Sequence, residues 1–365
     1  MKNTKSIYLD YNSSSVVRPQ VIKALLEAHK SLNASSIHQF GTESRKKINA
    51  AREIIAKSIN ADPSGLVFTS GATEANVSII KNSDRRLVIS SIEHDSVLIP
   101  STDKDDTEYI HTNEQGLISL KSLENILDKN DGPYLISTML VNNETGVIQP
   151  IEQIVEIAHK KNALVHCDAV QAFGKIPLDI NKLGVDYATL SAHKVGGPQG
   201  IGAIWIKPGI EFFPLIKGGS QENFRRAGTE NISGIIGFAE AVKCFSVNET
   251  KKILYLRKKL ENDLIKTAPI HIFGYKQNRI PNTVYFGNDK VSKEVQLVAL
   301  DLSGIGVSSG SACSSGKVGN SHVLEAMKID AKMMSSAIRV SIGWSTTEND
   351  IDYFVSKWSE IYHDN

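Results

Sequence analysis

Short apolar runs alternate with longer amphipathic stretches over most of the chain before Asn248. The amphipathic stretches at 74–81 and 151–161 have the spacing of helices, whereas the short runs are typical of buried strands. These apolar runs lie at 66–69, 86–90, 134–141, 163–167, 187–190 and 202–206. Strands that alternate with helices of this length form a mostly parallel sheet with helices on both faces. The first part of the chain therefore predicts an α/β domain.

After about Asn248 the pattern changes. Residues 251–266 predict a long helix of mixed charge, and residues 348–361 predict a last helix with one apolar face. Strand candidates between these helices lie at 271–273, 283–286 and 337–342. This mixture is typical of a separate α+β domain. We predict a large domain over residues 15–250 and a small domain built from residues 1–14 and 251–365.

The balance of charges narrows the choice of partners. The 365 residues include 41 Lys+Arg and 40 Asp+Glu, so the formal net charge is +1. This balance gives no support to nucleic acid or an anionic membrane as a direct partner. No stretch approaches the roughly 20 apolar residues that span a bilayer, and the first residues lack the apolar centre of a signal peptide. We therefore expect a cytoplasmic protein without membrane insertion or direct nucleic-acid binding.

The chain has three cysteines, and their positions argue against disulfides and metal sites. Cys167, Cys244 and Cys313 show no CxxC or Cys/His spacing, so we expect no metal site. Cys167 and Cys244 flank apolar segments, which predicts inert buried thiols. Cys313 lies in a run of serine and glycine at 308–316, which has little to bury. An exposed thiol on such a loop is either incidental or reactive, and we favour a reactive one.

A lysine and an aspartate follow two of the predicted strands. Lys194 ends the sequence Ser191-Ala192-His193-Lys194, and burial there would lower its pKa and make the amine a nucleophile able to form a Schiff base. Asp168 follows the apolar run at 163–167, where a carboxylate can hold a pyridinium nitrogen protonated. Taken singly, a surface lysine and a turn-capping aspartate are the commoner roles. Together they form the pair that a pyridoxal phosphate site requires.

Three further motifs fit the same kind of site. The turn at 70–76 leads small residues into a helix, where backbone N–H groups and the Thr73 hydroxyl can bind an anion. His94 follows a strand and could stack on a flat ring, and the Asn143 amide could donate to a ring oxygen. Each motif also has an ordinary structural explanation, namely a capped helix, an incidental histidine and a tight turn.

Taken in order, the motifs resemble those of cysteine desulfurases of the NifS/IscS type, within the class V aminotransferase group of fold-type I pyridoxal-phosphate enzymes. The matching segments are 33–38, 69–76, 93–94, 141–144, 168–171, 191–194, 226–229, 308–313 and 337–341. Two departures, Ser13-Ser14-Ser15 and Ala34, fall where the family forms the substrate pocket. The resemblance implies a large domain with a mostly parallel sheet flanked by helices and a smaller α+β domain.

The resemblance also implies roles for individual residues. Those that would bind the pyridoxal 5'-phosphate are Ala72, Thr73, His94, Asn143, Asp168, Gln171, Ser191, His193 and Lys194. Thr229 would reach the phosphate of a partner subunit, which implies a homodimer with shared active sites. Arg339, with Asn143 beside it, would bind the substrate carboxylate as a guanidinium–carboxylate pair.

The catalytic residues implied by the resemblance are Lys194, His94 and Cys313. L-Cysteine would become L-alanine, Lys194 helped by His94 would move the α-proton, and Cys313 would accept the sulfur as a persulfide. A sulfur acceptor protein, such as an iron–sulfur scaffold, or the machinery of tRNA thiolation would then receive it. A selenocysteine lyase or another pyridoxal-phosphate enzyme of this fold is the alternative. An inactive sulfur-trafficking scaffold is a more remote one.

Overall fold

The largest element of the structure is a seven-stranded sheet with the strand order β2-β8-β7-β6-β5-β3-β4. The computed structural model describes residues 6–129, 132–310 and 320–364. The strands of this sheet are β2 (Leu66–Thr69), β3 (Arg86–Ser90), β4 (Glu108–Ile110), β5 (Tyr134–Met139), β6 (Leu164–Asp168), β7 (Tyr187–Ser191) and β8 (Gly202–Ile206). Strands β4, β3, β5, β6 and β7 run parallel to one another. The prediction of a mostly parallel sheet is confirmed.

Strand β8 departs from the parallel pattern. It runs antiparallel to both β7 and β2. Between β7 and β8 the chain has only the short helix η2 (Ala192–Lys194) and a glycine-rich turn. Because a parallel connection needs a crossover of a dozen or more residues, this short link reverses the chain direction. The link also places Lys194 at the edge where the parallel strands end.

Helices cover both faces of this sheet, and residue alternation along the strands decides which side chains meet which helices. On β3, Leu87 and Ile89 pack in the cluster that includes α3 (Ala72–Asn82), whereas Val88 packs in the cluster on the other face. Period-2 alternation with both faces apolar is what a sheet buried between two helical layers requires. The helices of the second layer include α2 (Gln39–Ser58), α5 (Leu120–Lys129), α6 (Ile151–His159) and α8 (Ile232–Lys243).

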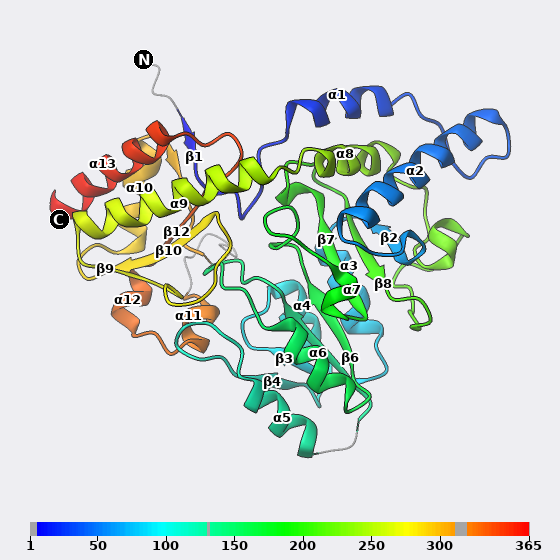
Figure 1. Cartoon of the computed structure of the whole chain (residues 1–365), viewed down its shortest axis with the longest axis horizontal. Coiled ribbons are helices and arrows are strands. Elements are labelled where there is room, and N and C mark those ends of the chain that lie inside the picture. The colour runs from blue at the N-terminus through cyan, green and yellow to red at the C-terminus, as the bar shows by residue number, and fades with distance from the viewer. Residues whose placement is uncertain (1–5, 130–131, 311–319, 365) are drawn as a thin grey trace.

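A second apolar core lies around a three-stranded antiparallel sheet of order β12-β10-β9 (Figure 1, left). Its elements are α9 (Val247–Thr267), β9 (Ile270–Ile272), β10 (Thr283–Asn288), α10 (Lys293–Leu302), β12 (Ile338–Ser341) and α13 (Glu348–Asp364). The N-terminal strand β1 (Ile7–Tyr8) pairs with β11 (Ile305–Gly306), and Ile7 and Leu9 belong to the same core. The boundaries of the two domains stay a prediction.

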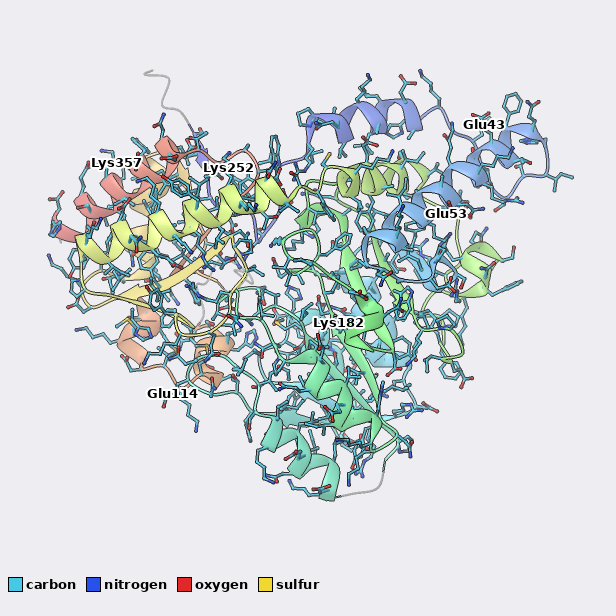
Figure 2. The ribbon with its side chains drawn as sticks, in the orientation of Figure 1. Glu43, Glu53, Glu114, Lys182, Lys252 and Lys357 are labelled. Carbon is cyan, nitrogen blue, oxygen red and sulfur yellow. The ribbon has the colours of Figure 1, made fainter. Side chains whose placement is uncertain are left out.

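The remaining helices connect these layers. They are α1 (Pro19–Ala28), η1 (Pro63–Gly65), α4 (Asp95–Ser101), α7 (Ile180–Leu183), η3 (Gln221–Phe224), α11 (His322–Ala326) and α12 (Ala331–Ser335). Acidic and basic side chains are spread over both parts of the molecule, as Glu43 and Glu53 on α2, Lys252 on α9 and Lys357 on α13 illustrate (Figure 2). Within the described ranges, no helix is both long and apolar enough to cross a bilayer.

Candidate active site

A cavity of about 630 Å³ lies where β5, β6 and β7 end. Most of the residues predicted for the site line it, namely Ala72, Thr73, His94, Asn143, Asp168, Gln171, Ser191, His193, Lys194 and Arg339. Ligands of such sheets bind beyond the carboxyl ends of the strands, so this is the place that the fold favours. The predicted sulfur acceptor, Cys313, lies outside the described residues, whereas Ser308 and Gly310 before it line the cavity.

Lys194 lies at the end of η2 with its amine among uncharged partners. The Nζ atom donates to the carbonyl oxygens of Asn12 and Ser13, each at 2.7 Å. Burial, and after it the nearby Arg339 cation, lower the pKa of Lys194 to about 8, although Asp10 and Asp168 act in the opposite direction. A lysine that is partly neutral near neutral pH is a nucleophile and a base.

Asp168 ends β6 with both of its oxygen atoms bonded. The backbone N–H of Val170 donates to Oδ1 at 3.0 Å, and the Asn76 amide donates to Oδ2 at 2.8 Å. Asp168 pairs in register with Thr189 on β7. Strand β7 ends two residues later, at Ser191, and leads directly to Lys194. The carboxylate and the amine therefore face one cavity from neighbouring strands.

The start of α3, at the edge of this cavity, has the features that favour a bound anion. Gly71 is the N-cap, and in the described structure no side chain accepts from the first N–H groups of the helix. The alternative of an ordinary side-chain cap is therefore wrong, because Thr73 lies inside the helix. A Cβ atom on Gly202 would come within 2.7 Å of the Gly71 backbone, so glycine permits this close approach of β8. Open N–H groups at a helix N-terminus favour negative charge.

Two predicted phosphate ligands lie beside this helix start. The Ser191 hydroxyl is buried and has no hydrogen-bond partner among the described residues. His193 shares a hydrogen bond of 3.3 Å with Ser14 Oγ, and burial lowers the pKa of His193 to about 4, with the cations Lys194 and Lys175 acting in the same direction. A buried hydroxyl without a partner is costly unless a ligand satisfies it. Both side chains therefore fit a bound anion.

Arg339, on β12, reaches the cavity from the second core. It donates to Asp10 Oδ1 at 2.7 Å and to the Asn143 carbonyl at 2.9 Å, and its side chain is 5% exposed. The Asn143 side-chain Oδ1 is buried without a partner in the described structure. A buried guanidinium that already binds one carboxylate has the chemistry to bind a second, on the substrate.

Among the predicted residues that the structure describes, Thr229 is the one that does not line this cavity. It is exposed and lines a separate hollow of about 140 Å³ with Arg226 and Gly228. The hollow and the cavity share Ser70, Gly200 and Ile201 as lining residues, so the two lie next to each other. Within one chain Thr229 therefore does not contribute to the site.

Sequence reasoning missed two residues that hold the site together, Asn12 and Lys175. The Asn12 carbonyl accepts from Lys194 Nζ and from Gln171 Nε2 at 3.0 Å, and the Asn12 side chain accepts from Lys175 Nζ at 2.9 Å. Lys175 Nζ also donates to Gln171 Oε1, and burial holds the pKa of Lys175 well below its usual range. The spacing of four residues between Gln171 and Lys175 was the available signal for this pair.

The two described cysteines differ in burial. Cys167 is buried as predicted, and burial raises the pKa of its thiol far above the usual range. Cys244 is only half-buried, which corrects the prediction, because it lies at the C-terminal end of α8 where the helix leaves the core. Burial still raises the pKa of Cys244. Neither thiol is therefore activated as a nucleophile.

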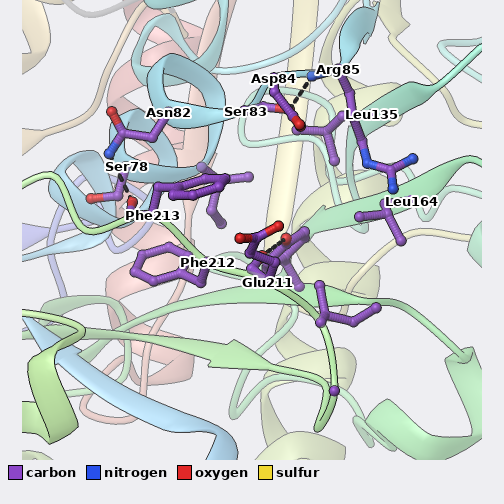
Figure 3. Close-up of a pocket in the computed structure, with 14 residues that line it drawn as sticks. Ser78, Asn82, Ser83, Asp84, Arg85, Leu135, Leu164, Glu211, Phe212 and Phe213 are labelled. Carbon is purple, nitrogen blue, oxygen red and sulfur yellow. Dashed lines mark hydrogen bonds between the residues drawn. The ribbon is translucent and has the colours of Figure 1, made fainter.

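A smaller cavity of about 270 Å³ lies at the other end of the parallel strands, where they begin (Figure 3). Its lining residues include Arg85, Leu135 and Leu164, which lie where β3, β5 and β6 begin, together with Glu211 and Phe213. None of its lining residues is lysine, histidine or cysteine. Among the residues that the structure describes, no group of three or more His, Cys, Asp or Glu side chains could hold a metal ion.

Comparison with known proteins agrees with this arrangement. The model of the family "Aminotransferase class-V" matches residues 7–354. The cysteine desulfurase IscS of Dictyoglomus turgidum is 38% identical over 96% of this chain and 92% of its own length. The chain belongs to the class-V aminotransferase family, among the cysteine desulfurases of the NifS/IscS type.

Solved structures of this family have the same fold. A NifS-like protein from Rickettsia africae superposes with a TM-score of 0.91 at 35% identity and covers 98% of this chain and 100% of its own. A structure described as SspA in complex with cysteine superposes with a TM-score of 0.82 at 30% identity, over 94% of this chain and 100% of its own. The agreement confirms the predicted fold class and family.

The departure of this NifS/IscS-type chain from the family pattern at Ser13-Ser14-Ser15 falls inside the cavity. Ser13 and Ser14 line it, the Ser13 carbonyl accepts from Lys194, and the Ser14 hydroxyl shares a hydrogen bond with His193. Ala34 is buried, and its carbonyl accepts two hydrogen bonds from Arg45. The serine departure therefore touches the candidate site directly.

Proposed function

We propose that this protein is a pyridoxal-phosphate-dependent cysteine desulfurase that converts L-cysteine to L-alanine and places the sulfur on Cys313. The observation that carries the proposal is the placement of Lys194 and Asp168 at neighbouring strand ends of one cavity, beside the open N-terminus of α3. The relatives named as cysteine desulfurases and the structural neighbour described with cysteine support the same substrate.

The residues present fit pyridoxal phosphate. Lys194 offers a buried amine of lowered pKa for its aldehyde, and Asp168 offers a carboxylate for the pyridine nitrogen. The start of α3 and the buried Ser191 hydroxyl offer donors for its phosphate. Gln171 and Asn143 would contact the ring hydroxyl, and His94 would stack on the ring. When bound, the cofactor supplies an electron sink for the α-carbon of the substrate.

The chain's own groups then position the substrate and move its proton. Arg339 binds the substrate carboxylate and thereby orients the α-carbon toward Lys194. The neutral Lys194 amine takes the α-proton at Nζ, since its lowered pKa leaves a fraction of it unprotonated near neutral pH. His94, which lines the same cavity, faces the substrate from α4.

Sulfur transfer requires a second thiol. The Cys313 thiolate attacks the sulfur of the substrate, so an S–S bond forms and the C–S bond breaks. The electron pair of the broken bond stays with the substrate carbon, which takes a proton and leaves as alanine. Cys313 keeps the sulfur as a persulfide, which exchange with an acceptor thiol can pass on. An iron–sulfur scaffold protein in the cytoplasm is the acceptor that we propose.

We further propose a homodimer in which Thr229 binds the phosphate in the partner subunit. The segment before Thr229 supports this role, because Glu222, Asn223 and Phe224 all have positive φ angles, between 49° and 64°. A backbone that most residues avoid must be stabilised by its surroundings, here by a buried ion pair between Arg52 and Glu222. Phe224 is left 70% exposed, as a side chain at an interface between subunits would be.

The decisive experiment incubates the purified protein, loaded with pyridoxal phosphate, with L-cysteine. We expect alanine and a protein-bound persulfide to appear together, and Cys313→Ser to bind cysteine but form no persulfide. Alanine and sulfide production by Cys313→Ser at the wild-type rate would exclude Cys313 as the acceptor. Selenocysteine supplied in place of cysteine tests the lyase alternative, and light scattering tests the dimer.

A further inference from the structure

A fully buried amide links the Asp168 carboxylate to Ser96, which in turn contacts His94. Asn76, on α3, is 0% exposed, and its Nδ2 atom donates to Asp168 Oδ2 at 2.8 Å and to Ser96 Oγ at 2.9 Å. Asn76 Oδ1 has no hydrogen-bond partner in the described structure. If the Asn76 amide were turned by half a turn, its Oδ1 atom would face the Asp168 carboxylate, which is unfavourable. The two acceptors, Asp168 Oδ2 and Ser96 Oγ, therefore fix the orientation of the amide.

Ser96 extends this chain of hydrogen bonds to His94. Ser96 Oγ accepts from Asn76, so its own proton is free to point at His94 Nδ1, which lies 2.9 Å away. The backbone N–H of Ser96 also donates to His94 Nδ1, at 3.0 Å, because His94 is the N-cap of α4. An imidazole nitrogen that accepts two hydrogen bonds carries no proton. The proton of neutral His94 is therefore on Nε2.

We propose that Asn76 is a positioning residue that orients the Asp168 carboxylate and holds His94 as the neutral tautomer with its proton on Nε2. His94 then offers the cavity a hydrogen-bond donor and does not take the α-proton of the substrate. That proton goes to the neutral amine of Lys194 instead. The inference rests on the proposed function, and it corrects the expectation that His94 shares the work of Lys194.

The charges around His94 are compatible with a neutral ring. Its pKa is lowered, chiefly by burial, and Lys194 and His322 act in the same direction. Asp168 and Asp95 oppose them. A proton on His94 Nδ1 would face the two donors that Ser96 already directs at this atom, its hydroxyl and its backbone N–H. This arrangement makes protonation of the ring less favourable.

Nitrogen-15 NMR of histidine-labelled protein tests the tautomer directly, with the His94 signal assigned from His94→Gln. We expect the wild-type signal of the Nε2–H tautomer at neutral pH, with and without cofactor. Ser96→Ala should raise the titration midpoint of His94 by about one pH unit, since a protonated Nδ1 then meets one fewer donor. Asn76→Leu should shift it in the same direction, because the Ser96 hydroxyl is then free to turn and accept from a protonated Nδ1. Asn82→Leu, on the same helix, removes a hydrogen bond to the Phe213 carbonyl and should change nothing.

An Nδ1–H tautomer in the wild type would overturn the proposal, and so would unchanged midpoints in Asn76→Leu and Ser96→Ala. Ser96→Ala alone decides this point if Asn76→Leu does not fold. The measurement needs no turnover, so it fails independently of the proposed function.

The affinity for pyridoxal phosphate tests the Asp168 half of the proposal. Asn76→Leu should raise the dissociation constant about tenfold, because a hydrogen bond to a charged group is lost. Asn76→Asp keeps the shape but places a second carboxylate beside Asp168, so its affinity should fall further as the pH rises. Wild-type affinity in both variants, measured by equilibrium dialysis, would show that Asn76 does not position Asp168.

Discussion

The two cavities of the seven-stranded sheet have the same walls of parallel strands but opposite chemistry. At the carboxyl ends, Lys194, Asp168 and Arg339 line one cavity with Ser191 and Asn143, whose side chains have buried polar atoms without a partner among the described residues. At the amino ends, the Arg85 guanidinium donates to the Asn162 carbonyl, and the phenyl rings of Phe212 and Phe213 form part of the wall (Figure 3).

The difference shows what strand direction does for function. Each parallel strand is followed by a loop at its carboxyl end. These loops lead into the N-termini of helices, whose N–H groups favour bound anions. The start of α3 and the η2 turn at Lys194 both lie on that side. The volumes of the two cavities, about 630 and 270 Å³, do not by themselves explain this difference in chemistry. Unpartnered donors and a lysine of lowered pKa do.

The largest expected effect contrasts the two cavities directly. Lys194→Ala should lower the rate of alanine formation by about a thousandfold or more, because it removes the general base and the amine that binds the cofactor. Arg85→Ala, in the cavity at the amino ends, should leave the rate within about twofold of wild type. An assay of alanine released from L-cysteine checks both. A similar loss of alanine formation in both variants would contradict the assignment of the reaction to the cavity at the carboxyl ends.

The next effect concerns substrate binding by the second core. Arg339→Lys should raise the KM for L-cysteine by about 10- to 100-fold, since a lysine cannot donate two parallel hydrogen bonds to a carboxylate. Steady-state kinetics measure this. Arg86→Lys, which alters an exposed pair with Asp106, is the matched control. A change in kcat alone, with KM as in the wild type, would contradict the assignment of Arg339.

The rate of cofactor attachment should follow the titration of Lys194. Only the neutral amine attacks, and burial lowers the pKa of Lys194 to about 8 from its usual value near 10.5. The attachment rate of the apoprotein should therefore rise about tenfold per pH unit below pH 8 and level off above it. Stopped-flow absorbance checks this profile. A rate that still rises steeply at pH 10 would mean that Lys194 has an ordinary pKa.

The smallest effect concerns Lys175, whose amine donates a hydrogen bond to the Gln171 side chain and so orients it. Lys175→Met should weaken cofactor binding by about three- to tenfold, because the Gln171 amide loses a fixed partner. Lys182→Met, which removes an exposed lysine paired with Glu152, is the control. Equilibrium dialysis measures both variants. Equal affinities would show that Gln171 is oriented without Lys175.

Local sequence patterns predicted six of the seven strands of the large sheet and the polar residues that follow them, but not the short strand β4 at its edge. The apolar runs that became β3 and β8 coincide with the observed strands, and Lys194 and Asp168 lie at strand ends as predicted. These features depend on residues close together in the chain. The family resemblance then supplied roles that single motifs left open.

Contacts between distant segments could not be predicted in this way. Arg339 pairs with Asp10 and Asn76 pairs with Asp168, and only the folded chain brings these residues together. The half-burial of Cys244 depends on where α8 ends relative to its neighbours. The antiparallel direction of β8 follows from the short connection between β7 and β8. The pattern of apolar residues predicts a strand but not its direction.

Chemical trapping of the cofactor tests the central claim most directly. The protein loaded with pyridoxal phosphate is reduced with borohydride and digested, and the modified peptide is identified by mass spectrometry. The account predicts a pyridoxyl group on Lys194 in the wild type, and none on any other lysine in Lys194→Ala. A pyridoxyl group on Lys175, or on a lysine outside the cavity at the carboxyl ends, would contradict it.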